Sequence, residues 1–100
     1  MKNFSRYKQY IDEHKSLLTV FVVTYNRCDY LKLTIRSILE QTYKDFCLVV
    51  LDNASTDNTE KVVKSIIDER IIYLKQVENV GGPNNINTAL KIASTPYFII

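Results

Sequence analysis

The sequence predicts an α/β fold, Rossmann-like, with a mainly parallel sheet and flanking helices on both faces. Two mainly apolar runs, residues 17–23 and 46–51, have the length of strands and lack the alternation of a strand with one solvated face. Such runs are typical of strands that are buried on both faces, which requires helices on each side of the sheet. Segments with helical spacing alternate with these runs, and this alternation favours parallel strands joined by right-handed crossovers.

Length and composition fit a single globular domain. The chain has 100 residues, is 46% hydrophobic and contains two glycines and two prolines, which excludes disorder. A net charge of +2 with scattered basic residues gives no reason to expect nucleic acid as a partner. Met1–Lys15 does not resemble a signal peptide, and no apolar run approaches the roughly 20 residues that span a bilayer. Two separated cysteines, Cys28 and Cys47, predict free thiols, so we expect a cytoplasmic location.

Residues 1–16 are expected to form an amphipathic helix that precedes the main unit, residues 17–100. The apolar side chains that share one face of this helix are Phe4, Tyr7 and Ile11. In the main unit a first strand leads to a second helix, with Asp29 as its expected N-cap. The apolar stripe of this second helix has core-facing spacing and comprises Leu31, Ile35, Ile38 and Leu39.

The central strand, residues 46–51, ends at Asp52 and a polar loop, and a third helix follows. Asp57 is the expected N-cap of this helix, and Glu60, three residues later, is expected to complete a capping box. A short third strand then covers residues 71–74. The side chains of the third helix that are expected to face the core are Val62, Val63, Ile66 and Ile67.

The last part of the chain predicts one more helix and one more strand. Gly81 and Gly82 permit positive φ angles, and Pro83 suits the first turn of a helix. An apolar strand begins at residues 97–100. Because domains rarely stop on such a strand, we expect the first part of a longer protein, with self-association through the exposed strand edge. The fourth helix is expected to pack through Ile86, Ala89, Leu90 and Ala93.

Polar segments follow the ends of the first three strands and are predicted to meet at one edge of the sheet. They are residues 24–27, 52–57 and 79–85. In open parallel sheets the ligand crevice lies at the carboxyl ends of the strands. The sequence has neither a Gly-x-Gly-x-x-Gly loop nor a P-loop, which argues against hydride transfer on NAD and against P-loop phosphate hydrolysis. We therefore expect one binding site with a nucleotide ligand.

Asp52 is the central candidate of this site, and its role has two interpretations. A carboxylate only accepts hydrogen bonds, so it matches ribose hydroxyls or the N–H of uracil or thymine. Alternatively, Asp52 caps the backbone of its own loop. Arg27 also has two interpretations: it contacts a diphosphate, or it forms a surface ion pair with a nearby acid such as Asp29. Tyr25 either stacks on a base or covers the sheet edge.

Three motifs in order resemble the N-terminal half of an inverting GT-A glycosyltransferase of family 2, over about residues 18–100. They are Thr-Tyr-Asn-Arg at 24–27, Ser-Ile-Leu-Glu-Gln-Thr-Tyr at 37–43 leading into Asp-Phe, and Asp-Asn-Ala-Ser-Thr-Asp-Asn-Thr at 52–59. The resemblance implies a GT-A type sheet and transfer of a sugar from a nucleoside diphosphate to a saccharide or lipid-linked acceptor, as in polysaccharide biosynthesis. A non-catalytic nucleotide-binding or interaction module with the same fold is the alternative.

The resemblance also implies a donor, a metal and a set of binding residues. The donor would be a UDP- or dTDP-sugar, and Mg²⁺ or Mn²⁺ would act in the full-length enzyme. The metal ligands and the catalytic base would lie beyond residue 100, so these 100 residues alone are expected to be inactive. Asn53 stands where many members have a second acid, and asparagines stand at 84, 85 and 87 where many have arginine. The implied nucleotide-binding residues are Thr24, Tyr25, Asn26, Arg27, Asp52, Asn53, Ser55, Gly81, Gly82 and Asn84.

Overall fold

Helices and strands alternate along the whole of the described chain. The computed structural model describes residues 4–100, with side chains from Ser5 onward, so the predicted inward role of the Phe4 side chain lies outside the described part. The elements are α1 (Phe4–His14), β1 (Leu18–Thr24), α2 (Cys28–Leu39), β2 (Phe46–Asp52), α3 (Thr59–Lys64), β3 (Ile71–Lys75), α4 (Gly82–Ile92) and β4 (Tyr97–Ile99).

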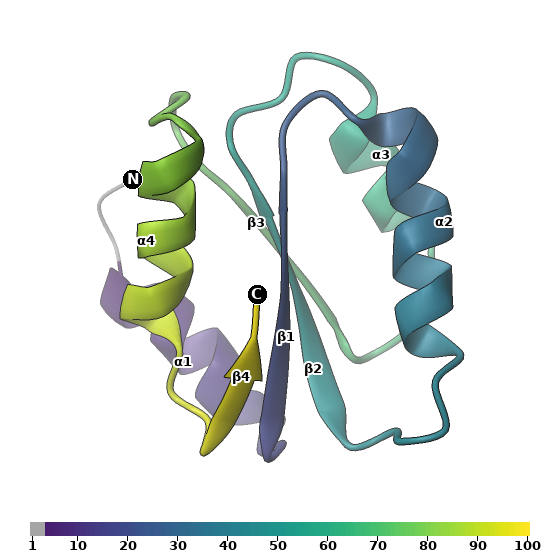
Figure 1. Cartoon of the computed structure of the whole chain (residues 1–100), viewed down its shortest axis with the longest axis vertical. Coiled ribbons are helices and arrows are strands. Elements are labelled where there is room, and N and C mark those ends of the chain that lie inside the picture. The colour runs from purple at the N-terminus through teal and green to yellow at the C-terminus, as the bar shows by residue number, and fades with distance from the viewer. Residues whose placement is uncertain (1–3) are drawn as a thin grey trace.

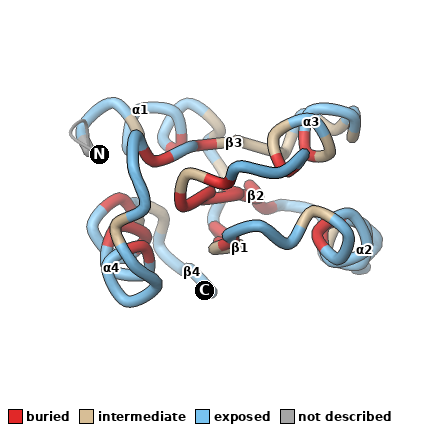
Figure 2. Tube along the Cα trace, turned by 90° about the horizontal axis from the view of Figure 1, so that it is seen from above, coloured by how far each residue is buried: buried red, intermediate tan, exposed pale blue. Residues whose placement is uncertain are grey.

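The strands form one parallel sheet in the order β3-β2-β1-β4, which confirms the predicted α/β fold. Figure 1 shows α1 and α4 on one face of the sheet and α2 and α3 on the other, and the view from above in Figure 2 separates the same two layers. Thr24 pairs with Asp52, and Asp52 pairs with Lys75. Three strands therefore end level, at the top of Figure 1, where their following loops meet.

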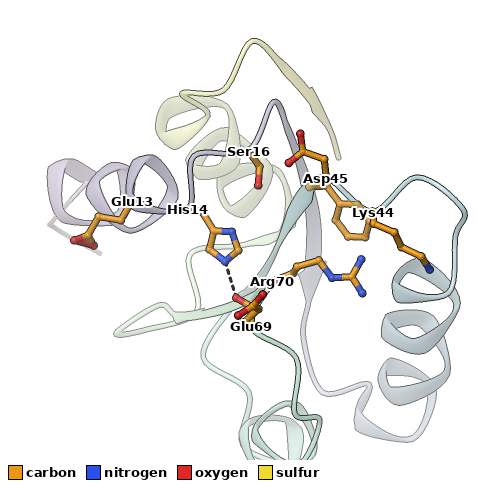
Figure 3. Close-up of a pocket in the computed structure, with 8 residues that line it drawn as sticks. Glu13, His14, Ser16, Lys44, Asp45, Glu69 and Arg70 are labelled. Atoms are coloured by element: carbon orange, nitrogen blue, oxygen red, sulfur yellow. Dashed lines mark hydrogen bonds between the residues drawn. The ribbon is translucent and has the colours of Figure 1, made fainter.

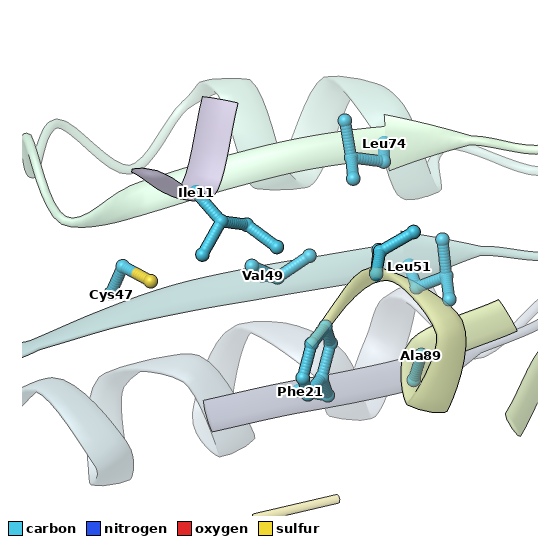
Figure 4. Packing of buried hydrophobic residues seen from close by; sticks show 8 residues of the cluster. Ile11, Phe21, Cys47, Val49, Leu51, Leu74 and Ala89 are labelled. Atoms are coloured by element: carbon cyan, nitrogen blue, oxygen red, sulfur yellow. The ribbon is translucent and has the colours of Figure 1, made fainter. Parts of the chain in front are cut away.

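The central strand is buried on both faces, as its unbroken apolar run predicted. Every residue of β2 is buried. Cys47, Val49 and Leu51 face α1 and α4, where they pack with Ile11 and Phe21 (Figure 4). On the other face the core beneath α2 and α3 contains Leu31, Ile35, Phe46, Leu48, Val50 and Val63. The helix α1 is part of the first of these cores, because Ile11 is fully buried.

The predicted helix caps are only partly right: Asp57 accepts from the N–H of Thr59 in the first turn of α3, but the N-cap positions differ from the prediction. The helix α2 begins at Cys28, with Arg27 at the N-cap position, so Asp29 lies inside the first turn and not at the predicted N-cap position. The helix α3 begins at Thr59, so the predicted capping box does not form. Glu60 instead pairs with Lys64 at 2.7 Å and with Lys75 at 3.7 Å. Because α3 ends at Lys64, Ile67 lies beyond it and is 93% exposed, contrary to its predicted inward role.

The buried face of α4 also differs from the prediction. Ala89 is buried as expected, but Ile86 and Leu90 are 40% and 50% exposed. The helix is rotated so that polar side chains point inward, and its buried residues are Asn85, Thr88, Ala89 and Ile92. These polar groups find partners in Gln76, whose Nε2 donates to Asn85 Oδ1 at 3.1 Å and to Thr88 Oγ1 at 3.2 Å.

The edge of the sheet at β4 is exposed. Tyr97, Phe98 and Ile99 are 69%, 44% and 57% exposed, and within residues 4–100 β4 pairs only with Leu18, Thr19 and Val20 of β1. An apolar hollow of about 530 Å³ lies beside this edge and includes Ile99 and Ile100. Self-association through this edge stays a prediction.

Candidate functional site

The predicted site residues of the three loops lie together at the carboxyl ends of β1, β2 and β3, and Gly82 and Asn84 follow in α4. The sheet's hydrogen bonding continues into the loops, because Asn53 N–H donates to Thr24 C=O at 2.9 Å and Gln76 N–H donates to Asp52 C=O at 2.8 Å. Here the first loop denotes residues 25–27, the second loop 53–58 and the third loop 76–81. The three loops are adjacent, as the sequence predicted, because their strands are neighbours in a parallel sheet.

Asp52 is fully buried at the end of β2, between the ends of β1 and β3. Its Oδ1 accepts from the backbone N–H of Ser55 at 3.0 Å and from Ser55 Oγ at 2.5 Å. Its Oδ2 accepts from the hydroxyl of Tyr73 at 2.5 Å. Burial raises the pKa of Tyr73, and the hydrogen bond to Asp52 raises that pKa further, so the phenol stays protonated and donates.

These bonds occupy most of the acceptor capacity of the carboxylate, since its two oxygens offer about four lone-pair sites. Of the two interpretations of Asp52, the one in which it caps the backbone of its own loop is observed, in its bond to Ser55 N–H. Contact with a base or ribose stays a prediction. Sequence reasoning missed Tyr73, which lies in an apolar run; its link to Asp52 depends on the pairing of β3 with β2.

Asn26 joins the first loop to the second. Its backbone has φ +50°, in the left-handed region that asparagine tolerates. Its N–H donates to Ser55 Oγ at 2.9 Å, and its Oδ1 accepts from the N–H of Thr56 at 2.8 Å and of Asp57 at 3.3 Å. Because Ser55 Oγ in turn donates to Asp52, the first loop is connected to the buried carboxylate through one hydroxyl.

Asn53 joins the second loop to the third. Its Nδ2 donates to Asn79 Oδ1 at 3.0 Å, and its Oδ1 accepts from Val80 N–H at 2.9 Å. Gly81, which follows, has φ +89°, so it uses the conformational freedom predicted for it, whereas Gly82 is the first residue of α4. Three segments of the chain are thus held together by side-chain amides.

An open cleft of about 370 Å³ lies beside the first loop. Tyr25 is 43% exposed and Tyr30 is 62% exposed, and both line the cleft with Arg27. Within residues 4–100 Arg27 forms no ion pair, so the alternative in which Asp29 neutralises it is not observed. Thr24 lines the cleft floor and is buried. Asn84 and Gly82 lie apart from this cleft, exposed at the start of α4.

Asp57 fastens the second loop to the starts of two helices. It accepts from the N–H of Thr59 at 3.0 Å, from the Thr59 hydroxyl, and from the N–H of Cys28 at 3.3 Å. These bonds, the Thr59 hydroxyl first among them, lower the pKa of Asp57 from 3.8 to about 2. A group with a lowered pKa in the folded state stabilises that state above its unfolded pKa and loses this effect as pH falls.

We therefore expect Asp57→Asn to change the acid sensitivity of the protein. The stabilisation from the carboxylate is fully present above pH 3.8 and is lost as pH falls through about 2. The difference in melting temperature between the native protein and the variant should shrink between pH 5 and pH 2, as measured by circular dichroism. A difference that stays constant over this range would contradict the assigned role.

A second hollow, of about 450 Å³, lies at the opposite end of the sheet (Figure 3). His14 Nε2 lies 2.6 Å from the carbonyl oxygen of Glu69, which ties the end of α1 to the loop before β3. Arg70 pairs with Asp68 at 2.8 Å and stacks on the Phe46 ring at 4.8 Å. These contacts of His14 and Arg70 join segments of the fold, and the hollow is remote from the three loops.

Among residues 4–100, no cluster of three or more histidine, cysteine, aspartate or glutamate side chains could hold a metal ion. The rim carboxylates Asp52 and Asp57 accept hydrogen bonds from their own loops. The described residues therefore do not form a metal site. The same part of the chain has no helix with the length and apolar character needed to cross a membrane.

Comparison with known proteins identifies the family. The profile described as "Glycosyl transferase family 2" matches residues 19–100. The chain belongs to glycosyl transferase family 2. A relative from Escherichia coli, the UDP-Glc:alpha-D-GlcNAc-diphosphoundecaprenol beta-1,3-glucosyltransferase WfaP, is 37% identical over 81 residues, which are 81% of this chain and 32% of the relative.

Two solved structures, one of them a mannosyltransferase, share this fold. The mannosyltransferase PcManGT from Pyrobaculum calidifontis, in complex with GDP-Man and Mn²⁺, aligns with a TM-score of 0.69 and 27% identity over 91% of this chain and 31% of that one. Residues 1–349 of TarS from S. aureus align with a TM-score of 0.71 and 31% identity over 82% of this chain and 26% of theirs. The sheet is therefore of the GT-A type found in glycosyltransferases. This family 2 chain spans about a third of the length of the E. coli relative and of the Pyrobaculum enzyme.

Proposed function

We propose that this chain is the nucleotide-sugar-binding part of a glycosyltransferase. In a longer protein it would transfer the sugar of a nucleoside diphosphate sugar to a saccharide or lipid-linked acceptor. The observation that carries the proposal is the set of interlocked polar loops at the carboxyl ends of β1, β2 and β3, beside a cleft in which Arg27 has no ion pair with an acid of residues 4–100. Such a crevice is where α/β sheets bind nucleotides.

The cleft supports the proposal through its chemistry. Tyr25 and Tyr30 are exposed aromatic rings, which can stack on a base or on a sugar face. Arg27 supplies a guanidinium with no ion pair to an acid of residues 4–100, and such a group suits a diphosphate. Thr24 adds a hydroxyl at the cleft floor. Together these groups match the three parts of a nucleoside diphosphate sugar.

For the donor we propose UDP or dTDP, because both carry a pyrimidine with an N–H for an acceptor group. The E. coli relative is named for UDP-Glc, which supports uridine, whereas the Pyrobaculum enzyme was solved with GDP-Man. The donor base is therefore the property to test first.

For the metal we propose Mg²⁺ or Mn²⁺ held by residues outside this chain. On the edge of β1 that pairs with β4, residues 21–24 have no strand partner within residues 4–100, and they lead directly to the first loop. A carboxylate motif beside this edge would lie close to the cleft. A non-catalytic nucleotide-binding module remains the second candidate, favoured by the engagement of Asp52 and Asp57 in internal hydrogen bonds.

The test is a binding panel with UDP, dTDP, CDP and GDP, measured by thermal shift and then by titration calorimetry. A ligand that binds only the folded protein raises its melting temperature. We expect a shift with UDP or dTDP, and we expect Arg27→Ala to weaken binding about tenfold, since it removes a charge-assisted contact. Arg36→Ala, at an exposed position in the last turn of α2, is the matched control. A protein that responds to none of the nucleotides would refute the proposed function.

A further inference from the structure

The three loops of the site are held to one another chiefly by two asparagine side chains. Asn26 accepts from the backbone N–H groups of Thr56 and Asp57, and its Nδ2 lies 3.4 Å from Thr56 Oγ1. Asn53 exchanges hydrogen bonds with Asn79 and Val80. Asn26 thus connects the first loop to the second, and Asn53 connects the second to the third.

The orientation of each amide follows from its backbone partners. A backbone N–H only donates, so the atom of Asn53 that faces Val80 N–H must be its oxygen, and its NH₂ group must face Asn79. Asn79 Oδ1 also accepts from Gly81 N–H at 2.8 Å, so this oxygen cannot turn away without losing a bond. The Asn53–Asn79 pair is therefore a directional latch, with its donor on Asn53.

Neither asparagine is arranged to meet a ligand. Asn53 is only 3% exposed, and both its oxygen and its nitrogen have partners in the third loop. Asn26 is exposed, but both polar atoms of its side chain are bonded to the second loop. These contacts hold both side chains in place without a nucleotide.

We propose that Asn26 and Asn53 are positioning residues: they assemble the three loops before a nucleotide arrives and do not contact it. This inference rests on the proposed nucleotide-binding function. Ordering flexible loops costs binding free energy, so loops that are already ordered bind more tightly. The latch also accounts for the amide at position 53, because a carboxylate there would face the oxygen of Asn79 with no proton to donate.

The latch is tested with Asn53→Asp, which preserves the size of the side chain and removes its donor. Hydrogen exchange of the ligand-free protein, followed by mass spectrometry, should show faster exchange in residues 77–82 and no change in residues 24–28. UDP should bind roughly five- to tenfold more weakly, the scale of one lost hydrogen bond. In an Asn79→Ala background the same substitution should change UDP affinity less than twofold, because the opposing oxygen is gone.

The connection between the first and second loops is tested with Asn26→Gly. Glycine keeps the left-handed backbone available and removes the side-chain bridge. Exchange should rise in residues 24–28 and 55–58 but not in 77–82, and UDP affinity should fall about fivefold. Asn58→Gly is the matched control, since within residues 4–100 its exposed side chain makes no cap hydrogen bond to α3, and it should leave both readouts unchanged.

The outcomes separate the possibilities. Loss of UDP affinity with unchanged exchange would overturn the inference and make the asparagines direct ligand contacts. Unchanged exchange and unchanged affinity would overturn it as well. If the native protein binds no nucleotide, the proposed function fails, and the exchange measurements still decide whether the two asparagines hold the loops.

Discussion

Asp52→Ala is expected to lower the free energy of unfolding by about 3 kcal/mol. The substitution removes a fully buried carboxylate that accepts from the N–H and hydroxyl of Ser55 and from the hydroxyl of Tyr73. These donors would remain inside the protein without their charged acceptor, and hydrogen bonds to charged groups are worth more than neutral ones. Urea denaturation followed by circular dichroism measures the change.

Asp52→Asn separates the structural role of Asp52 from a binding role. The amide oxygen can still accept from Ser55, and the Tyr73 hydroxyl can rotate to accept from the new NH₂ group. We expect a smaller loss of stability, about 1 kcal/mol. A large loss of UDP affinity in this folded variant would support the predicted contact with the base, whereas unchanged affinity would leave Asp52 as a loop cap.

Tyr73→Phe is the companion variant, because it removes one donor and leaves the carboxylate. Its effect on stability should be well below that of Asp52→Ala. If the free energy of unfolding of Asp52→Ala differs from that of the native protein by less than about 0.5 kcal/mol, the structural role assigned to the carboxylate is wrong. A change of that size is what ordinary surface substitutions produce.

The sequence was most informative where local pattern and burial agree. The run from Phe46 to Leu51 has no polar residue, and only a strand covered on both faces can bury it completely, as β2 does. The loops at the strand ends followed from the parallel topology. Both glycines were predicted to permit a positive φ, and Gly81 adopts one, whereas Gly82 begins α4.

The helix ends and the partners of Asp52 could not be predicted in the same way. Asp57 binds the N–H of Thr59, as a cap would, but it also binds Cys28, and this second contact exists only once two loops are adjacent. Tyr73 reaches Asp52 through the register of β2 with β3. Such contacts join residues that are far apart in the chain, so no local pattern contains them.

The rotation of α4 has the same origin. Apolar spacing predicted that Ile86 and Leu90 would face the core, and both are exposed. The helix instead buries Asn85, whose Nδ2 donates to the carbonyl of Leu51 at 3.1 Å, just before β2 ends at Asp52. That carbonyl and the side chain of Gln76 need polar partners, and α4 supplies them.

Asn85→Ala is therefore expected to destabilise the protein by about 2–3 kcal/mol, although sequence reasoning placed this residue among the ligand loops. Asn85 is 2% exposed and bonds Leu51 C=O and Gln76 Nε2, so alanine would leave two buried polar groups with one partner fewer. Gln76 is the more vulnerable of the two, because its Oε1 already has no hydrogen-bond partner among the described residues.

The matched control is Asn87→Ala on the exposed side of the same helix. Alanine favours a helix more than asparagine does, so this variant should be neutral or slightly stabilising. Urea denaturation of both variants, together with UDP titration, distinguishes a packing residue from a ligand contact. The third loop leads directly into α4 at Gly82, so loss of α4 packing can also loosen this loop. We therefore expect Asn85→Ala to have a smaller effect on UDP affinity than on stability. If Asn85→Ala kept its stability and lost UDP affinity, Asn85 would be a ligand residue, and the polar face of α4 would belong to the binding site.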